Sequence, residues 1–254
     1  MRPVSATIND AVVYCVARIR VDFEDDGRHF PYEGTGFWVR AQGRLVFVTN
    51  RHNLDPNLRF GSETERTLSS IEIEMRIWDG ENATRETQYH EILSPSLAFD
   101  EQADCALVID PNIEGFHVVA LPAEAIADDF WLENRLHLMD RVFFVGYPRS
   151  PSGKRQWWDT GWNLPVSREA SIASLPSQSF ENSLVALTDV TLVSGHSFSG
   201  SSGSPVIHPA EGGDGRIVGL MTGHLGDRDQ YDIAVHGGLS YYTRSSAIWR
   251  LMKR

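Results

Sequence analysis

Short stretches rich in β-branched and aromatic residues, punctuated by glycine and polar residues, recur along most of this chain. The stretch GTGFWVR (34–40) is followed by LVFVTN (45–50) across a Gly43 turn, a pattern that predicts a β-hairpin. Residues 71–78 (IEIEMRIW) alternate apolar and charged side chains, which is typical of a strand with one face in water. The other strand-like segments lie at 12–23, 87–93, 105–110, 142–147, 185–192, 204–208, 217–223 and 239–244. We therefore expect an all-β protein.

Two segments favour helix instead. Residues 123–137 combine helix-forming residues with periodic apolar side chains, which predicts a helix in a linker. Residues 245–254 predict a short C-terminal helix that is capped by Ser245 or Ser246. The basic residues at its end complement the negative end of the helix dipole.

The strand-like segments form two sets, one before and one after this linker. A long loop is predicted at 149–183, where Trp157, Trp158 and Trp162 are interpreted as packing anchors. We expect two β lobes, arranged as a first lobe at 1–121, a linker at 122–140 and a second lobe at 141–254.

The net charge limits the class of partner. Among 254 residues, 34 are acidic and 23 are Lys or Arg, which gives a formal charge of −11 at pH 7. A protein that binds DNA or RNA neutralises phosphates with clustered basic side chains. The short basic run at 149–155 is interpreted as a solvated loop, so we expect no nucleic-acid partner.

The sequence carries no sign of a membrane span, an export signal or a metal site. No apolar run reaches the roughly 18 residues of a transmembrane helix, and the first residues lack the pattern of a signal peptide. Cys15 and Cys105 cannot form a framework of several disulfides. We expect a cytoplasmic protein with no membrane partner, no cofactor and no metal. A structural or surface role is the default for the histidines at 29, 90, 117, 137, 208 and 236, which lack metal-ligand spacing.

Three short segments carry the residue types needed for nucleophilic catalysis: VTNRH (48–52), ADCALV (103–108) and SGSSGSPV (199–206). Each alone has a common structural explanation, namely a histidine after a strand, an aspartate at the start of a strand, and a turn rich in glycine and serine. Together they supply a hydroxyl, a base and a carboxylate. A serine hydroxyl is a weak nucleophile until a base removes its proton, and histidine is the side chain best suited to do so near neutral pH.

These segments resemble the signature blocks of the chymotrypsin/trypsin-like peptidases, especially the bacterial intracellular branch. His52 matches the histidine of a Thr-x-x-His block, Asp104 the first residue of Asp-x-Ala-Leu, and Ser202 the nucleophile of Gly-x-Ser-Gly-Ser-Pro. GTGFWV resembles the family's strand before the histidine, and 238–252 resembles its last strand and terminal helix. The likeness runs from about residue 12 to the end of the chain, with the linker and the 149–183 loop unmatched.

The resemblance implies a chymotrypsin-like fold of two antiparallel six-stranded β-barrels, with an interdomain linker helix and a short C-terminal helix. It also implies that His52 is the general base, that Asp104 fixes the histidine tautomer, and that Ser202 attacks the substrate carbonyl. The backbone N–H groups of Gly200 and Ser202 would form the oxyanion hole.

Competing assignments for these roles are weaker. Asp100 lies outside the apolar strand and Asp110 lies at its far end. Ser201 is the rival nucleophile, but the Gly-x-Ser-Gly register favours Ser202. An α/β-hydrolase is disfavoured because Ser204 stands where the second glycine of its motif belongs, and because no alternation of strands and helices surrounds the serine.

One departure from the family concerns activation. In secreted members an aspartate just before the nucleophile pairs with a new N-terminus that cleavage releases, and here that place is Ser201. We therefore do not expect activation by that ion pair. If activity is controlled, the ordering of a loop or a regulatory protein partner is the expected means.

The second departure concerns the primary specificity pocket. No carboxylate stands at its base, which argues against a preference for Lys or Arg. Two histidines and small hydroxyls are compatible with an acidic side chain, as in the glutamyl endopeptidases, and a preference for a small or apolar side chain, with His224 only lining a loop, stays open beside it. The residues that match the family's substrate-binding pocket are His196, Ser197, Thr222, Gly223, His224 and Ser240.

The sequence thus predicts a trypsin-like serine endopeptidase that acts on proteins or peptides through an acyl-enzyme intermediate. A catalytically silent or partner-regulated binding protein on the same scaffold is the first alternative. An esterase or acyl transferase on this fold is the second, because it would use the same acyl-enzyme chemistry.

Overall fold

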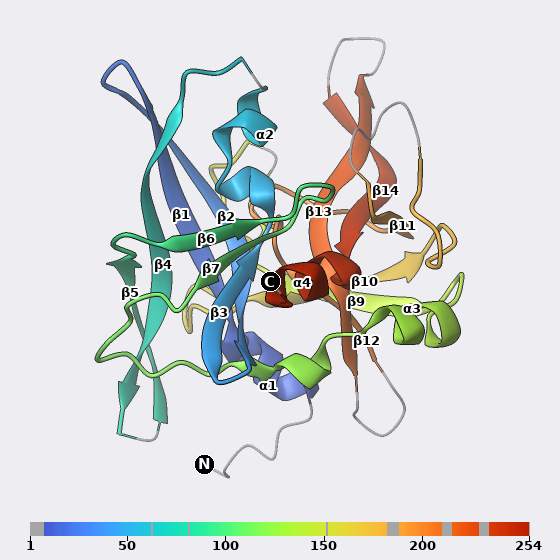
Figure 1. Ribbon diagram of the computed structural model, residues 1–254, viewed down its shortest axis with the longest axis horizontal. Helices are drawn as coiled ribbons and strands as arrows, with labels where there is room; N and C mark the ends of the chain where they lie inside the picture. The colour runs from blue at the N-terminus through green and yellow to red at the C-terminus, as the bar shows by residue number, and fades with distance from the viewer. Residues whose placement is uncertain are drawn as a thin grey trace.

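The computed structural model describes residues 8–61, 63–80, 82–150, 152–181, 188–209, 215–228 and 234–253. The chain is mostly β, with two sheets side by side and one helix between them (Figure 1). Within the described residues, none of the helices is long and apolar enough to cross a bilayer.

The first sheet is eight-stranded and open. Its strands pair in the order β5-β4-β1-β2-β3-β7-β6, and β8 pairs with β2 in parallel. The expectation of a closed six-stranded barrel is therefore wrong for this lobe. The two edge strands are β5 and β6, and no ladder joins them within the described residues. The bounds are β1 (Val16–Asp25), β2 (Arg28–Ala41), β3 (Arg44–Thr49), β4 (Thr67–Asp79), β5 (Asn82–Glu91), β6 (Ser96–Phe99), β7 (Ala106–Ile109) and β8 (Leu121–Pro122).

The second sheet is a closed barrel of six antiparallel strands, as expected. Its order is β10-β11-β14-β13-β12-β9. The strand β10 lies inside the segment that was expected to be a loop at 149–183. Ile172 is the one large apolar residue among its buried positions, and Arg168 and Ala170 occupy the preceding places on the same face, so its sequence shows the usual strand pattern only weakly. The bounds are β9 (Arg141–Gly146), β10 (Val166–Ile172), β11 (Val190–Ser194), β12 (Pro205–His208), β13 (Arg216–Arg228) and β14 (Ala234–Arg244).

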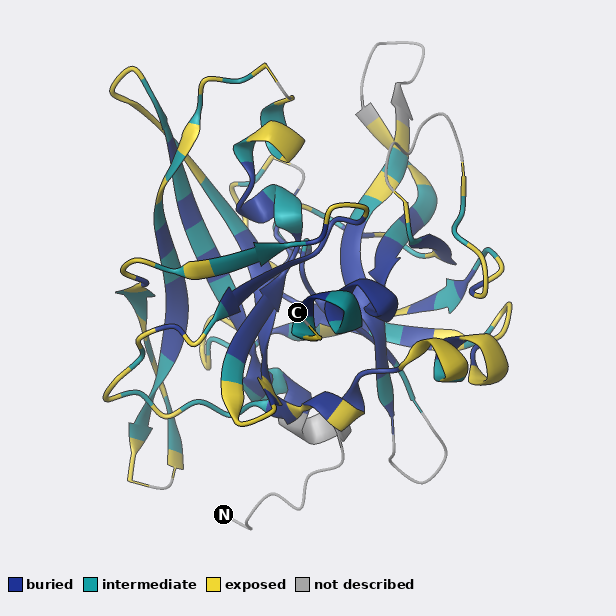
Figure 2. Cartoon of the chain, viewed as in Figure 1, coloured by how far each residue is buried: buried dark blue, intermediate teal, exposed yellow. Residues whose placement is uncertain are grey.

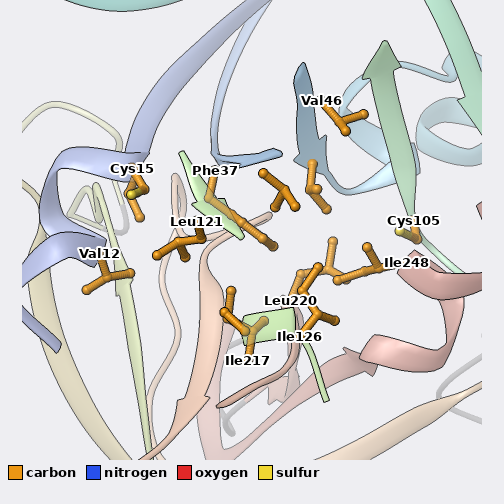
Figure 3. Close-up of a cluster of buried hydrophobic side chains, with 14 of the residues drawn as sticks. Val12, Cys15, Phe37, Val46, Cys105, Leu121, Ile126, Ile217, Leu220 and Ile248 are labelled. Carbon is orange, nitrogen blue, oxygen red and sulfur yellow. The ribbon is translucent and has the colours of Figure 1, made fainter. Parts of the chain in front are cut away.

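A shared hydrophobic cluster joins the two sheets (Figure 3). Phe37 reaches it from β2, Leu220 from β13 and Ile248 from the helix α4 (Ser245–Met252). The helix α1 (Ile8–Cys15) adds Val12 and Cys15. We expected a strand from residue 12 onward, but β1 begins only at Val16, because packing on this cluster overrides the β propensity of the preceding residues.

The connection between the sheets contains less helix than expected. In place of one helix over 123–137, there is a 3-10 turn at Ala123–Ala125 and the helix α3 (Asp129–Arg135). Asp128 caps α3 by accepting a hydrogen bond from the Trp131 N–H. The residue boundaries of the two lobes, 1–121 and 141–254, stay a prediction.

The C-terminal helix α4 is confirmed and lies between the two sheets, with one side buried (Figures 1 and 2). Neither expected capping serine caps it. The Ser245 hydroxyl donates to the Ala127 carbonyl over 2.7 Å, and Ser246 bonds the Asp129 carboxylate over 2.5 Å. These two serines therefore fasten α4 to the connection rather than to its own first turn.

Candidate active site

His52 lies in a 3-10 turn, Arg51–Asn53, that follows β3. Its backbone N–H donates to Asp104 Oδ1 over 2.8 Å, and its ring Nδ1 lies 2.5 Å from Asp104 Oδ2. The His52 side chain is 21% exposed and that of Asp104 only 1%. The Asp104 carboxylate thus holds both the backbone and the ring of His52, and the carboxylate itself is closed to water.

Asp104 lies in the connection between β6 and β7, and the two residues that follow β3, Asn50 and Arg51, hold that connection. Asn50 Nδ2 donates to the Asp104 carbonyl over 2.8 Å and to Thr222 Oγ1, on β13, over 3.1 Å. The Arg51 guanidinium donates to the Asp100 carbonyl over 2.9 Å. Both ends of the connection are therefore fixed relative to His52.

The two rival carboxylates are committed elsewhere. Asp100 accepts Arg250 Nε over 2.8 Å and caps the backbone N–H groups of Gln102 and Ala103. Burial alone would raise the pKa of Asp100, but these hydrogen bonds and the charge of Arg250 lower it below its ordinary value. Asp110 accepts Arg44 Nε over 2.7 Å at the surface.

Ser202 lies in an irregular loop that leads into β12. Gly200 and Gly203 on either side have φ values of +83° and +89°. A Cβ at Gly200 would lie 2.4 Å from the Tyr147 carbonyl oxygen, and a Cβ at Gly203 would lie 1.9 Å from that of Thr35. Only glycine combines a positive φ with the absence of a Cβ, so these two glycines fix the sharp turn that exposes Ser202.

The Ser202 hydroxyl donates to the Thr222 carbonyl over 3.4 Å, which is a long and weak bond. Within the described residues no hydrogen bond joins it to His52. The rival Ser201 is buried, and its hydroxyl accepts Arg168 Nη2 over 2.5 Å. Of the two serines, only Ser202 has a hydroxyl without a strong partner.

Two backbone N–H groups next to Ser202 are free to bind a ligand. Neither the Gly200 N–H nor the Ser202 N–H has an acceptor within the part of the chain that the structure describes. The Gly200 carbonyl is bound by Thr35 Oγ1 over 2.7 Å, and the Ser202 carbonyl by the Thr35 N–H over 2.8 Å. Both carbonyls are thereby held by β2.

A hydroxyl network lies beside this loop. The Ser197 N–H donates to Ser240 Oγ over 2.8 Å, and Ser197 Oγ donates to the Gly223 carbonyl over 3.1 Å. Ser240 Oγ in turn donates to the Gly195 carbonyl over 2.8 Å. These bonds tie the segment before Ser202 to β13 and β14.

Three histidine rings stack at the same place. The ring of His236, on β14, lies between His196 and His224, with centroid separations of 4.4 Å and 4.5 Å. His196 and His224 are exposed, whereas His236 is half-buried. Within the described ranges, no group of three or more His, Cys, Asp or Glu side chains is arranged to hold a metal ion.

The hydrogen bonds of His236 identify its tautomer. Its Nδ1 accepts the Gly238 N–H over 2.9 Å, so its ring proton lies on Nε2, which faces Ser240 Oγ at 3.4 Å. Burial, together with the nearby His224 and His196, lowers the pKa of His236 to about 4. Burial and His196 also lower the pKa of His224 below its ordinary value. The middle ring of the stack is therefore neutral at neutral pH.

A family model described as a trypsin-like peptidase domain matches residues 34–220. This chain belongs to the trypsin-like peptidase family. The match begins at the strand before His52 and extends beyond Ser202, so it covers all three of the expected catalytic residues.

Two solved structures share the fold of this trypsin-like domain. The active form of the Rv3671c protease from M. tuberculosis aligns with a TM-score of 0.55 and 16% identity, over 100% of this chain and 87% of that one. Deg5 aligns with a TM-score of 0.53 and 14% identity, over 96% of this chain and 89% of that one. At these identities the likeness concerns the fold alone. No curated protein sequence matches the chain.

The sequence missed two parts of this site. A structural or surface role is the default that the sequence predicts for His236. The pairing of β14 with β13 brings His236 close to His224, and no local sequence pattern indicates that pairing. Arg168 was missed together with β10. The other expected pocket residues lie in the network and stack described above, with Thr222 the residue whose carbonyl receives the Ser202 hydroxyl.

Proposed function

We propose that this trypsin-like domain is a serine endopeptidase that hydrolyses peptide bonds through an acyl-enzyme intermediate. The observation that carries the proposal is the double attachment of His52 to the buried Asp104, at 2.8 Å and 2.5 Å. A carboxylate that accepts the Nδ1 proton leaves Nε2 as the proton acceptor, which is the tautomer that a general base for Ser202 needs.

Ser202 would attack the substrate carbonyl while its proton passes to His52. Its bond to the Thr222 carbonyl is long at 3.4 Å, so little free energy holds the hydroxyl away from the histidine. The imidazolium that forms would be stabilised by the Asp104 carboxylate. The same proton would then go to the leaving amine, and water would hydrolyse the ester in a second cycle of these steps.

The negative oxygen of the tetrahedral intermediate would bind to the N–H groups of Gly200 and Ser202. Their lack of an acceptor among the described residues supports this role, because such groups are normally paired when they are buried. The loss of one oxyanion donor typically lowers kcat by about 10²–10³-fold.

We propose in addition that the pocket favours an acidic side chain at P1, the substrate residue before the cleaved bond. The stack of His196, His236 and His224 supports this, because imidazole N–H groups can donate to a carboxylate. A small or apolar P1 residue is the alternative, and it would make no use of the histidines.

The proposal is tested by labelling the purified protein with a fluorophosphonate probe, which reacts with activated serines. We expect labelling of the wild-type protein and its loss in Ser202→Ala and His52→Ala. His29→Ala is a matched control, because His29 pairs with Asp22 at the surface in the same chemical manner. Unchanged labelling of Ser202→Ala would contradict the proposal.

Two further results separate the alternatives. A folded wild-type protein that does not label would favour the silent binding protein. A protein that labels and cleaves small esters, but no peptide in a diverse library, would favour an esterase or acyl transferase.

A further inference from the structure

Arg168 occupies an unusual place in the barrel. It lies on β10, in line with the buried Ala170 and Ile172, and its guanidinium stacks over the ring of the core residue Phe144 at 4.4 Å. It also lies 5.3 Å from the ring of Phe198, in the loop before Ser202. The guanidinium therefore lies between the barrel interior and the nucleophile loop.

The guanidinium holds both ends of the segment 196–201. Nη1 donates to the His196 carbonyl over 2.9 Å, and Nη2 donates to Ser201 Oγ over 2.5 Å. His196 belongs to the histidine stack, and Ser201 directly precedes Ser202. The planar fork of an arginine suits two acceptors at once, which the point charge of a lysine does not.

No carboxylate among the described residues pairs with Arg168, and its Nε is buried without a partner there. Burial lowers the pKa of Arg168 to about 10, so the side chain still carries its charge at neutral pH. A partly buried cation without a counter-charge destabilises the fold. Residues that oppose stability in this way are expected at functional sites.

We propose that Arg168 is a positioning residue that holds the nucleophile loop in its reactive conformation. The inference rests on the proposed function. By fixing the His196 carbonyl and the Ser201 hydroxyl, the guanidinium sets the path of the backbone between them, and with it the direction of the Gly200 and Ser202 N–H groups. Because this cation comes from β10, the loop is held without a new N-terminus released by cleavage.

The test compares Arg168→Met and Arg168→Lys with the wild-type protein. Arg141→Met is a matched control, since Arg141 is the neighbouring surface arginine, 74% exposed, that pairs with Glu169. The rate of fluorophosphonate labelling and the kcat and KM for a peptide substrate are measured together with the Tm of each variant.

We expect Arg168→Met to lower the labelling rate and kcat by about 10- to 100-fold, with a smaller change in KM. Its Tm is expected to stay the same or to rise, because an uncompensated charge has been removed. Arg168→Lys is expected to recover only part of the rate. A merely structural role predicts the opposite pattern, in which Tm falls and activity falls only with the folded fraction.

A second readout does not depend on activity. The Ser201 N–H bonds the Phe198 carbonyl and the Ser204 N–H bonds the Ser201 carbonyl, both over 3.0 Å. Arg168→Met is expected to raise hydrogen exchange at these two amides about tenfold or more, with no change across β12. The proposal would be overturned if Arg168→Met left hydrogen exchange at the Ser201 and Ser204 amides unchanged, or if this variant were labelled at the wild-type rate. If the wild-type protein fails to label, the proposed function fails, while the exchange result still decides the role of Arg168.

Discussion

At the scale of single residues, the neutral His236 determines how the stack can hold charge. Its Nδ1 lone pair is committed to the Gly238 N–H, so a proton added to the stack goes to a neighbouring ring. His224 lies at the outer side of the stack and is exposed to solvent on the side away from His236. Its partial burial, together with the nearby His196, lowers its pKa. A bound carboxylate would counter that shift, since an opposite charge favours the protonated ring.

This predicts a pH dependence of specificity. The ratio of kcat/KM for a peptide with Glu at P1 to one with Gln at P1 isolates the pocket, because His52 acts on both. We expect the ratio to be highest between about pH 4.5 and 6.5, where the P1 carboxylate is ionised and an imidazole can be protonated, and to fall as pH rises.

His224→Gln is expected to lower this ratio about tenfold and to flatten its pH profile. His90→Gln, at the surface of the first sheet, should leave both unchanged. A wild-type ratio at or below one across this range would exclude the acidic preference.

At the scale of elements, α4 couples the end of the chain to the loop that carries Asp104. Arg250 donates to Asp100 over 2.8 Å and to Asp189 over 2.6 Å. The Asp100 side chain is only 2% exposed, whereas that of Arg250 is 35% exposed. One helix residue thus bridges two carboxylates from different lobes, and Arg244 also pairs with Asp189.

We predict that Arg250→Met lowers the free energy of unfolding by about 2–3 kcal/mol at pH 7. The value lies below that for a fully buried pair because water screens Arg250. The folded-state pKa of Asp100 is lowered, so its stabilising contribution is complete above about pH 4 and disappears as the pH falls through the lowered value.

Urea unfolding at several pH values checks this prediction. The difference between wild type and variant should be largest near neutral pH and should shrink below pH 4. Arg44→Met, which breaks the exposed pair with Asp110, should cost no more than about 1 kcal/mol. A larger cost there than in Arg250→Met would contradict this account.

At the scale of the whole molecule, the candidate site exists only where the two sheets meet. The first sheet supplies His52 and Asp104, and the barrel supplies the Ser202 loop. Thr35 of β2 aligns them: its N–H bonds the Ser202 carbonyl, its hydroxyl bonds the Gly200 carbonyl, and its own carbonyl accepts Thr49 Oγ1 over 2.8 Å.

We predict that Thr35→Val, which removes the hydroxyl at nearly constant volume, lowers kcat about tenfold because the Gly200 carbonyl loses its donor. The unfolding free energy should fall by only about 1–2 kcal/mol. Enzyme kinetics and calorimetry measure the two effects. Thr160→Val, at an exposed site, is the control, and an unchanged kcat in Thr35→Val would show that the cross-sheet bond is not needed.

What the sequence predicts well is what a short segment determines by itself. The hairpin at 34–50 and the glycine turns around Ser202 follow from local motifs, whereas the approach of Asp104 to His52 is expected only from the family resemblance. What it misses depends on contacts distant in sequence. The helix at 8–15, the weakly patterned β10 with Arg168, and the place of His236 beside His224 are all decided by packing or register that no local pattern records.

The open first sheet has a consequence for how the molecule behaves in concentrated solution. A sheet that does not close leaves edge strands whose backbone groups could pair with another chain and begin aggregation. One edge strand, β6, is only four residues long and so offers few free backbone groups with which another chain could pair. The other edge, β5, is ten residues long but carries Arg85, Glu86 and Glu91. Short length at one edge and charge at the other, with the chain's −11 net charge, oppose edge-to-edge association.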